Sequence, residues 1–480
     1  MDDLGTLDLT GQAEAVRSGQ VSPAELVEAA IARAERVQPV LRPFATTRFD
    51  RAREEAAFAT ASRMDAPFPG VPFALKDLAC PVAGEPSHEG MRALAEAGYH
   101  ATVTAHIARR FAQAGLIVIG RTTTPELGIM PVTEPALHGP SRNPWDPSRT
   151  PGGSSGGSGV AVAAGVVAAA HASDGGGSIR IPASCCGLVG LKPSRGRVSV
   201  GPASGELTRP LSVPFVLART VRDVAALLDV AAGPEIGDPV QAPPPRRPYR
   251  QEVGAEPEQL RIGLMTRRPG GAGTVHPDCV AAAEVAARHL EALGHVVEVT
   301  HPAALDEPAR MATFLGLWAS YASFAVDSWG RELGRELGPG DTEPLTWALV
   351  EIGRTVTAPK LLEALCDMER WSRRVQQWWA DGWDLLLTPT LGEPPLRIGE
   401  LDPPADNPLG GYQRAASFVP FTPPFNQTGQ PAISLPLHRN AEGLPIGVQL
   451  VAAYGREDLL LQVAAQLEQT VGWPTLAPAP

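Results

Sequence analysis

Two glycine- and serine-rich stretches constrain the fold of this chain more than any other feature. They are Pro151-Gly-Gly-Ser-Ser-Gly-Gly-Ser158 and Ser173-Asp-Gly-Gly-Gly-Ser178, and residues 160–170 between them are small, apolar and uncharged. In isolation, such stretches are typical of flexible linkers. The uncharged segment between them is expected to be buried, however, so both stretches must lie against the core. Glycine at such places lets main-chain N–H groups approach a ligand closely, as in an oxyanion hole.

The residues around these stretches exclude a phosphate-binding loop and make an α/β-hydrolase nucleophile elbow less well supported. No lysine follows either glycine run with the spacing of a phosphate-binding loop, which excludes nucleotide binding by that route. Gly152-x-Ser154-x-Gly156 matches the nucleophile elbow of α/β-hydrolases, but that motif follows a strand, and residues 139–151 carry four prolines. An esterase of that kind stays an alternative. His138 and His171 are the nearest histidines, and neither stands in a motif that marks a catalytic base.

Lysine is the remaining candidate base. Phe73-Ala-Leu-Lys-Asp-Leu-Ala79 predicts a short buried strand that carries Lys76 near its end. Burial disfavours the charged ammonium and lowers the pKa of a lysine, so a fraction of the side chains becomes a free amine that can accept a proton from a serine. The alternative is that Lys76 pairs with Asp77 or another carboxylate and only stabilises the fold. The two serine-rich stretches favour the role of base.

These motifs resemble those of the amidase signature family, hydrolases with a serine, cis-serine and lysine triad. The resemblance rests on the Lys-Asp pair, on Gly-Gly-Ser-Ser-Gly-Gly and on Gly-Gly-Ser-Ile-Arg, and later segments such as Asn426-Gln-Thr-Gly-Gln-Pro-Ala432 extend it over nearly the whole chain. Residues 175–197 are most similar to the bacterial amidases grouped with the 6-aminohexanoate cyclic-dimer (nylon oligomer) hydrolases. Similar enzymes act on aryl amides and on carbamates.

The resemblance assigns roles to individual residues. It implies that Ser178 is the nucleophile, that Ser154 relays its proton after a cis peptide bond from Gly153, and that Lys76 accepts the proton. The oxyanion hole would be formed by the main-chain N–H groups of Gly175, Gly176 and Gly177, together with that of Ser178 itself. A supporting role around the triad falls to Gly153, Ser155, Asp174 and Arg180. A surface ion pair is the alternative for the last two.

The substrate pocket is expected downstream of these motifs. Seven of the nine tryptophans lie within residues 318–383, a region that in the family helps to form the pocket. We expect Phe314 and Trp318, together with Met130, to line it. Helix packing is the alternative interpretation for each tryptophan. One local departure from the family is Ala172-Ser173, which stands where Gly-Thr is common.

The resemblance implies a serine hydrolase that cleaves C–N bonds of small linear or cyclic amides, or of carbamates and urethanes, with esterase activity as a side reaction. It implies no metal and no organic cofactor. The chain could instead be the amidase subunit of a tRNA-dependent amidotransferase. The sequence of residues 173–197 disfavours this alternative. An α/β-hydrolase-like esterase and a noncatalytic protein that has kept the fold also stay open.

Composition agrees with an enzyme of small molecules. Lys plus Arg number 41 against 52 Asp plus Glu, a net charge of −11 that argues against nonspecific nucleic-acid binding. No apolar run reaches the length of about 18 residues that a membrane helix needs, and the N-terminus is acidic, so we expect a cytoplasmic enzyme without a membrane partner. The sequence leaves a homodimer open. Reduced thiols that fill the core are expected at Cys80, Cys185, Cys186, Cys279 and Cys366.

Periodicity predicts an α/β fold, with a central mixed, twisted sheet covered by helices on both faces. Ser22-Pro-Ala-Glu25 is a capping box that starts a helix running to about residue 37, and a second helix is expected over residues 48–62. Helix and strand patterns then alternate over residues 106–120 and 221–299. We expect one domain over residues 1–480, with an N-terminal helical segment in 1–65, the catalytic motifs in 66–230 and substrate-pocket helices in 300–400.

Overall fold

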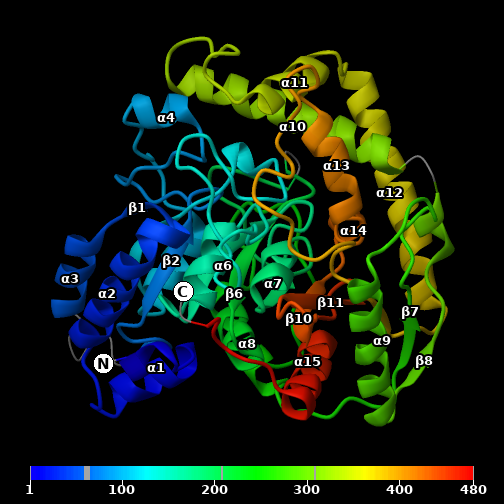
Figure 1. The fold of residues 1–480 in the computed structure, drawn as a ribbon, viewed down its shortest axis with the longest axis horizontal. Helices are drawn as coiled ribbons and strands as arrows, with labels where there is room; N and C mark the ends of the chain where they lie inside the picture. The colour runs from blue at the N-terminus through cyan, green and yellow to red at the C-terminus, as the bar shows by residue number, and fades with distance from the viewer. Residues whose placement is uncertain (1, 59–64, 207–208, 308–309, 479–480) are drawn as a thin grey trace.

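The computed structural model describes residues 2–58, 65–206, 209–307 and 310–478, and one mixed sheet runs through it (Figure 1). Its strands are β1 (Phe44–Thr47), β2 (Pro72–Lys76), β3 (Ile117–Thr122), β4 (Ala169–Asp174), β5 (Val189–Lys192), β6 (Val213–Ala218), β7 (Arg261–Leu264), β8 (Val296–Glu298), β9 (Leu385–Pro389), β10 (Ala432–Arg439) and β11 (Pro445–Ala452).

The 11 strands lie in the order β1-β3-β2-β4-β6-β5-β10-β11-β9-β7-β8. β2 pairs in parallel with β3 and β4, and β7 pairs in parallel with β8 and β9, whereas the strands between β4 and β9 are antiparallel. Every residue of β2, β4, β6 and β9 is buried. β6 is a continuous apolar run, as is typical of a strand buried on both faces, whereas β4 also carries the polar residues His171, Ser173 and Asp174. The predicted mixed sheet is confirmed.

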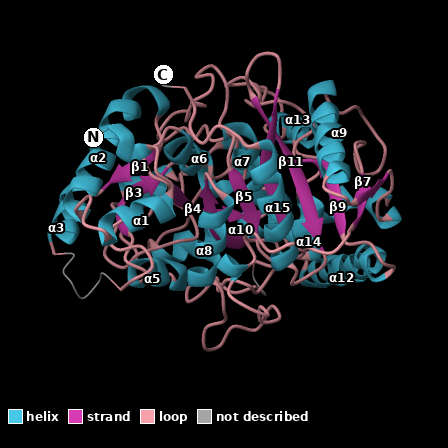
Figure 2. Ribbon diagram, turned by 90° about the horizontal axis from the view of Figure 1, so that it is seen from below, coloured by secondary structure: helices cyan, strands magenta, loops and turns pink. Residues whose placement is uncertain are grey.

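Helices cover both faces of the sheet (Figure 2). They are α1 (Leu9–Arg17), α2 (Pro23–Leu41), α3 (Phe49–Ala57), α4 (Arg92–Glu96), α5 (His106–Gln113), α6 (Gly156–Ala163), α7 (Arg180–Cys186), α8 (Val221–Ala231), α9 (Pro277–Ala292), α10 (Arg310–Glu332), α11 (Pro344–Arg354), α12 (Ala358–Ala380), α13 (Gly410–Phe418), α14 (Pro423–Thr428) and α15 (Glu457–Val471). No helix in the described ranges is long and apolar enough to cross a membrane.

The N-terminal segment differs in one respect from the expected helical segment. The capping box at Ser22 is present, since its hydroxyl accepts from the Glu25 N–H and its own N–H donates to the Glu25 carboxylate. Between α2 and α3, however, Phe44-Ala-Thr-Thr47 forms β1, which pairs antiparallel with β3 at one edge of the sheet. The segment is therefore partly built into the sheet. α3 ends at Ala57, and the end expected for this helix lies outside the described residues.

The cysteines follow the prediction with one exception. Cys80, Cys185, Cys186 and Cys279 are buried and unpaired, as expected for thiols that fill the core. Cys366 on α12 is exposed instead, because the outer face of that long amphipathic helix points to solvent.

Candidate active site

The catalytic candidates meet at one edge of the sheet. β2 and β4 are parallel neighbours, so their carboxyl ends lie side by side. Lys76 is the last residue of β2, and Ser173 and Asp174 end β4. Ser154 lies in the loop just before α6, and Ser178 in the loop just before α7. The parallel pairing therefore brings the lysine of one motif next to the serines of the other two.

The Lys76 side chain is fully buried and contacts the relay serine. Its Nζ lies 2.7 Å from Ser154 Oγ and 3.0 Å from Ser173 Oγ. The Asp77 carboxylate is engaged elsewhere, since it accepts from the His88 main-chain N–H at 3.2 Å. The alternative in which Lys76 forms an ion pair with Asp77 is therefore not the arrangement in the structure.

The surroundings of Lys76 favour its free amine. Burial lowers the pKa of Lys76 to about 7, although the Asp174 and Glu89 carboxylates act in the opposite direction. At neutral pH about half of these side chains carry a lone pair that can accept a proton. His171 is not a competing base: burial lowers its pKa to about 3, and its Nδ1 accepts from the Lys76 main-chain N–H at 3.3 Å. His171 thus holds the strand that presents the lysine.

Ser178 lies within the same cavity as the relay serine. It is 8% exposed, and it lines that cavity together with Ser154 and Ser173. No hydrogen bond joins the Ser178 and Ser154 hydroxyls in the part of the chain that the structure describes. Contacts between nucleophile and base are often long without substrate and tighten when it binds. The predicted contact between Lys76 and Ser154 is therefore present, and a contact between Ser154 and Ser178 would form inside this cavity.

Asp174 organises the loop that carries Ser178. Its carboxylate accepts from the main-chain N–H groups of Gly177 at 2.7 Å and Ile179 at 3.2 Å, and from the Arg180 guanidinium at 2.9 and 3.0 Å. Both side chains of the ion pair are 0% exposed, so the surface-pair alternative is wrong. Burial alone would raise the pKa of Asp174, but Arg180 holds it at about 2. The carboxylate is therefore ionised at neutral pH.

The main-chain donors of this loop differ from the prediction at one position. The Gly177 N–H already donates to Asp174, so in this geometry it is not available to a substrate oxyanion. The N–H groups of Gly175, Gly176 and Ser178 have no acceptor within the described residues, and all three residues line the cavities. These three are the candidate oxyanion donors.

Close packing explains the glycines around Ser154. The Gly153–Ser154 peptide is cis, as the resemblance implied. A Cβ atom added to Gly153 would lie 2.7 Å from the Val132 main chain, which leaves no room for any side chain. Ser155 ties this loop to β4, because its hydroxyl accepts from the Ser173 N–H at 3.3 Å. The loop is fixed on both sides of the relay serine.

Two polar residues at the site had no assigned role before the structure. Asn426 donates to the Asp174 carboxylate at 2.8 Å and accepts from Arg180 at 2.6 Å, which completes a buried network. Ser173 supplies the second hydroxyl beside Lys76. The sequence held a signal for each, since Asn426 lies in a segment that matches the family and Ser173 keeps a hydroxyl where threonine is common.

Two cavities meet at Ser178. The larger has a volume of about 270 Å³, and its wall includes Ser154, Ser173 and Gly175. The smaller has a volume of about 70 Å³, and its wall includes Gly176. Both cavities are bordered by Gly128, Ser178 and Trp318.

The residues predicted to line the pocket do lie on these walls. Met130 and Phe314 line the smaller cavity, and Trp318 stacks on Phe314 with ring centroids 5.4 Å apart. The helix-packing interpretation holds for other tryptophans of this region: Trp371 and Trp379 lie in a separate apolar cluster. Trp318 is therefore the tryptophan that separates the two cavities.

A positively charged side chain that no sequence pattern indicated lies on the wall of the larger cavity. Arg209 lies on its wall, with the guanidinium 5.1 Å from the centroid of the Tyr321 ring. The position can be found only from the structure, because Tyr321 belongs to α10 and Arg209 to a loop far away in the sequence.

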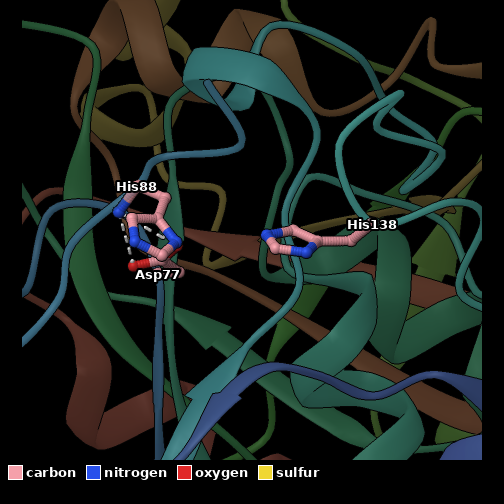
Figure 3. A group of neighbouring side chains, drawn as sticks. All are labelled: Asp77, His88 and His138. Atoms are coloured by element: carbon pink, nitrogen blue, oxygen red, sulfur yellow. Dashed lines mark hydrogen bonds between the residues drawn. The ribbon is translucent and has the colours of Figure 1, made fainter. Parts of the chain in front are cut away.

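Asp77, His88 and His138 are the group of described residues that could hold a metal ion. Each offers one ligand atom, the three atoms lie within 4.8 Å of one another, and the His138 ring points toward the other two (Figure 3). Zinc bonds of about 2.0–2.2 Å bring neighbouring ligand atoms to roughly 3.3 Å, so these side chains would have to move together to hold an ion. That no metal takes part stays a prediction.

The chain matches the amidase family over residues 25–461. It is 42% identical over 478 residues to a 6-aminohexanoate-cyclic-dimer hydrolase of Paenarthrobacter ureafaciens, covering 98% of this chain and 96% of that protein. The solved structure of a 6-aminohexanoate cyclic dimer hydrolase complexed with substrate matches 99% of both chains with a TM-score of 0.95 and 42% identity. A bacterial aryl acylamidase of the amidase signature family matches with a TM-score of 0.88 and 26% identity, covering 97% of this chain and 96% of that one.

These similarities extend over the whole sheet and over every motif of the site. Two of the relatives at 42% identity are named 6-aminohexanoate-cyclic-dimer hydrolases, so the amidotransferase alternative is less supported. The fold and the site geometry agree with the sequence on the same conclusion. The chain is a member of the amidase signature family, a hydrolase that acts on amide C–N bonds.

Proposed function

We propose that this enzyme cleaves small carboxamides and carbamates through a covalent acyl-enzyme on Ser178. One observation carries the proposal: Lys76 Nζ lies 2.7 Å from Ser154 Oγ, in the wall of the cavity that contains Ser178. A serine hydroxyl is a weak nucleophile until an adjacent base takes its proton. The buried amine of Lys76 is that base, and Ser154 connects it to the nucleophile.

The reaction balances its protons along this relay. Ser178 Oγ forms a bond to the carbonyl carbon, its proton passes to Ser154, and the Ser154 proton passes to Lys76. When the C–N bond breaks, Ser154 returns a proton to the departing nitrogen and is reprotonated by Lys76. Water then attacks the acyl-enzyme, and the same three groups move its proton.

The oxyanion that forms during attack is stabilised by the N–H groups of Gly175, Gly176 and Ser178. In other serine hydrolases, removing one such donor costs about 3–4 kcal/mol of transition-state stabilisation. Asp174 fixes the loop by accepting from Gly177 and Arg180, so the donors do not have to be ordered during the reaction.

The substrate class follows from the relatives and the cavity. The names of the relatives refer to 6-aminohexanoate cyclic dimer and to aryl acylamides. A cavity of about 270 Å³ with mainly apolar side chains suits neutral amides of that size. The buried, unpaired cysteines favour a reducing compartment, and we place the enzyme in the cytoplasm on that ground. Its partner is the small-molecule substrate, and its oligomeric state is open.

The test is amine release from four substrates: 6-aminohexanoate cyclic dimer, a linear aliphatic amide, a nitroanilide and an aryl carbamate. We expect the wild-type protein and Ser148→Ala, which alters an exposed serine, to release amine from at least one of them, and Ser178→Ala to release none. Intact-protein mass after a fluorophosphonate probe should show one adduct that Ser178→Ala lacks. Equal release by wild type and Ser178→Ala would refute the assignment of the nucleophile.

A further inference from the structure

The two cavities at Ser178 differ in which catalytic group they contain. The larger cavity, of about 270 Å³, contains Ser154 and Ser173 and continues between α10 and α12 to Phe324 and Leu365. The smaller, of about 70 Å³, lies on the other side of Trp318 and contains neither of those two serines. Ser178 borders both, so a carbonyl carbon bonded to Ser178 Oγ would lie where they meet.

The path of the proton fixes the orientation of an amide at this junction. The departing nitrogen must lie within hydrogen-bond reach of its proton donor, about 2.6–3.2 Å between heavy atoms. That donor is Ser154, held by Lys76 at 2.7 Å on the wall of the larger cavity. The acyl substituent is bonded to the same carbon and projects away from the nitrogen, toward the smaller cavity.

The oxyanion donors agree with this orientation. Gly175 lines the larger cavity and Gly176 lines the smaller one, so an oxygen held between their N–H groups lies between the two spaces. Such an oxygen leaves one space to each of the two other substituents of the carbon, and the position of Ser154 decides that the nitrogen takes the larger one.

We infer that the larger cavity takes the amine part of the substrate and the smaller cavity takes the acyl part, so that the enzyme selects short acyl groups on bulky, apolar amines. This inference rests on the proposed function and adds its specificity. The smaller cavity has about a quarter of the volume of the larger one, so the shorter part of the amide fits there. Its wall is apolar and includes Met130, Phe314 and Tyr412.

The test uses two isomeric amides of the same composition, N-benzylacetamide and N-methyl-2-phenylacetamide. Both release an alkylamine, and they differ in which side of the amide carries the phenyl ring. We expect kcat/KM for N-benzylacetamide to exceed that for its isomer by at least about tenfold, the lower end of the effect of one extra methylene in an apolar pocket. Equal values, or a preference for the phenylacetyl isomer, would overturn the inference, whereas amide hydrolysis itself would stand.

Two matched truncations locate the acyl side. Met130 and Leu365 are half-buried apolar side chains on the smaller and the larger cavity respectively. Met130→Ala should raise the relative kcat/KM for the phenylacetyl isomer at least tenfold, and Leu365→Ala should not. The opposite result would place the acyl group in the larger cavity and refute the assignment.

An ester series covers the case in which neither amide turns over. Failure to hydrolyse either amide would count against the proposed function. The size of the acyl group that fits would then be tested by the rates at which 4-nitrophenyl acetate and 4-nitrophenyl hexanoate acylate Ser178, followed by intact-protein mass. Acylation at least tenfold slower by the hexanoate, relieved by Met130→Ala, supports the inference. Equal rates overturn it.

Discussion

The pH dependence of kcat/KM tests the role of Lys76 most directly. Burial lowers the pKa of this lysine to about 7, and only its free amine can start the relay. With that pKa the free-amine fraction is about 0.09 at pH 6 and about 0.91 at pH 8, so kcat/KM should rise roughly tenfold between them and then level off. An unperturbed lysine would instead give a rise that continues above pH 9.

A single substitution separates Lys76 from other groups that titrate near neutrality. The Glu89 carboxylate raises the pKa of Lys76, and it is buried, with the Trp329 indole N–H donating to it at 3.0 Å. Glu89→Gln keeps the size and the acceptor but removes the charge. The midpoint of the rise should therefore move to lower pH, with the plateau at high pH retained.

The assay is release of nitroaniline from an acyl nitroanilide between pH 5.5 and 9.5, because this amine does not titrate in that range. The rate of fluorophosphonate labelling of Ser178 should follow the same curve, since it needs the same base and no leaving amine. A flat profile, an acidic optimum, or a Glu89→Gln midpoint that moves to higher pH would refute the reasoning.

The remaining predictions concern stability and specificity. Lys76→Met should abolish turnover and raise Tm more at pH 6 than at pH 9. Because burial lowers the pKa of Lys76 from 10.5 to about 7, its charged form lowers the free energy of unfolding by about 5 kcal/mol below pH 7. That cost fades as pH rises toward 10.5. Equal shifts at both pH values would contradict it. Asp174→Asn leaves the buried Arg180 unpaired and should cost about 3–5 kcal/mol, a fall in Tm of roughly 3–5 °C by calorimetry for 480 residues, with a lower kcat; an unchanged Tm would show that the ion pair is dispensable. Gly153→Ala should remove activity and lower Tm, because its Cβ would lie 2.7 Å from neighbouring main chain; a fully active variant would disprove the close packing. Trp318→Ala should change the ratio of kcat/KM between substrates with short and long acyl groups and leave Tm nearly unchanged. An unchanged ratio with a lowered Tm would mean that the indole serves packing.

Helices and strands with local causes can be predicted from short stretches of the chain. The capping box at Ser22 starts a helix because its partners are three positions apart, and the buried strand at Lys76 follows from an unbroken apolar run. The three residues of the proposed triad could be selected from the sequence, because the serines and the lysine lie inside short motifs of fixed order. The mixed character of the sheet followed from the alternation of strand and helix patterns.

The roles of several residues at the site depend on contacts between distant parts of the chain. Asn426 reaches Asp174 across 252 positions, and no local pattern encodes such a contact. The same holds for the N–H of Gly177: its sequence is that of an oxyanion donor, and only the fold of the loop aims it at Asp174 instead. The two cavities depend on helices that approach the loop from elsewhere in the chain, so their volumes and the place of Trp318 between them appear only after the sheet has assembled. Motifs fix which atoms can react, whereas long-range packing fixes where the substrate can lie.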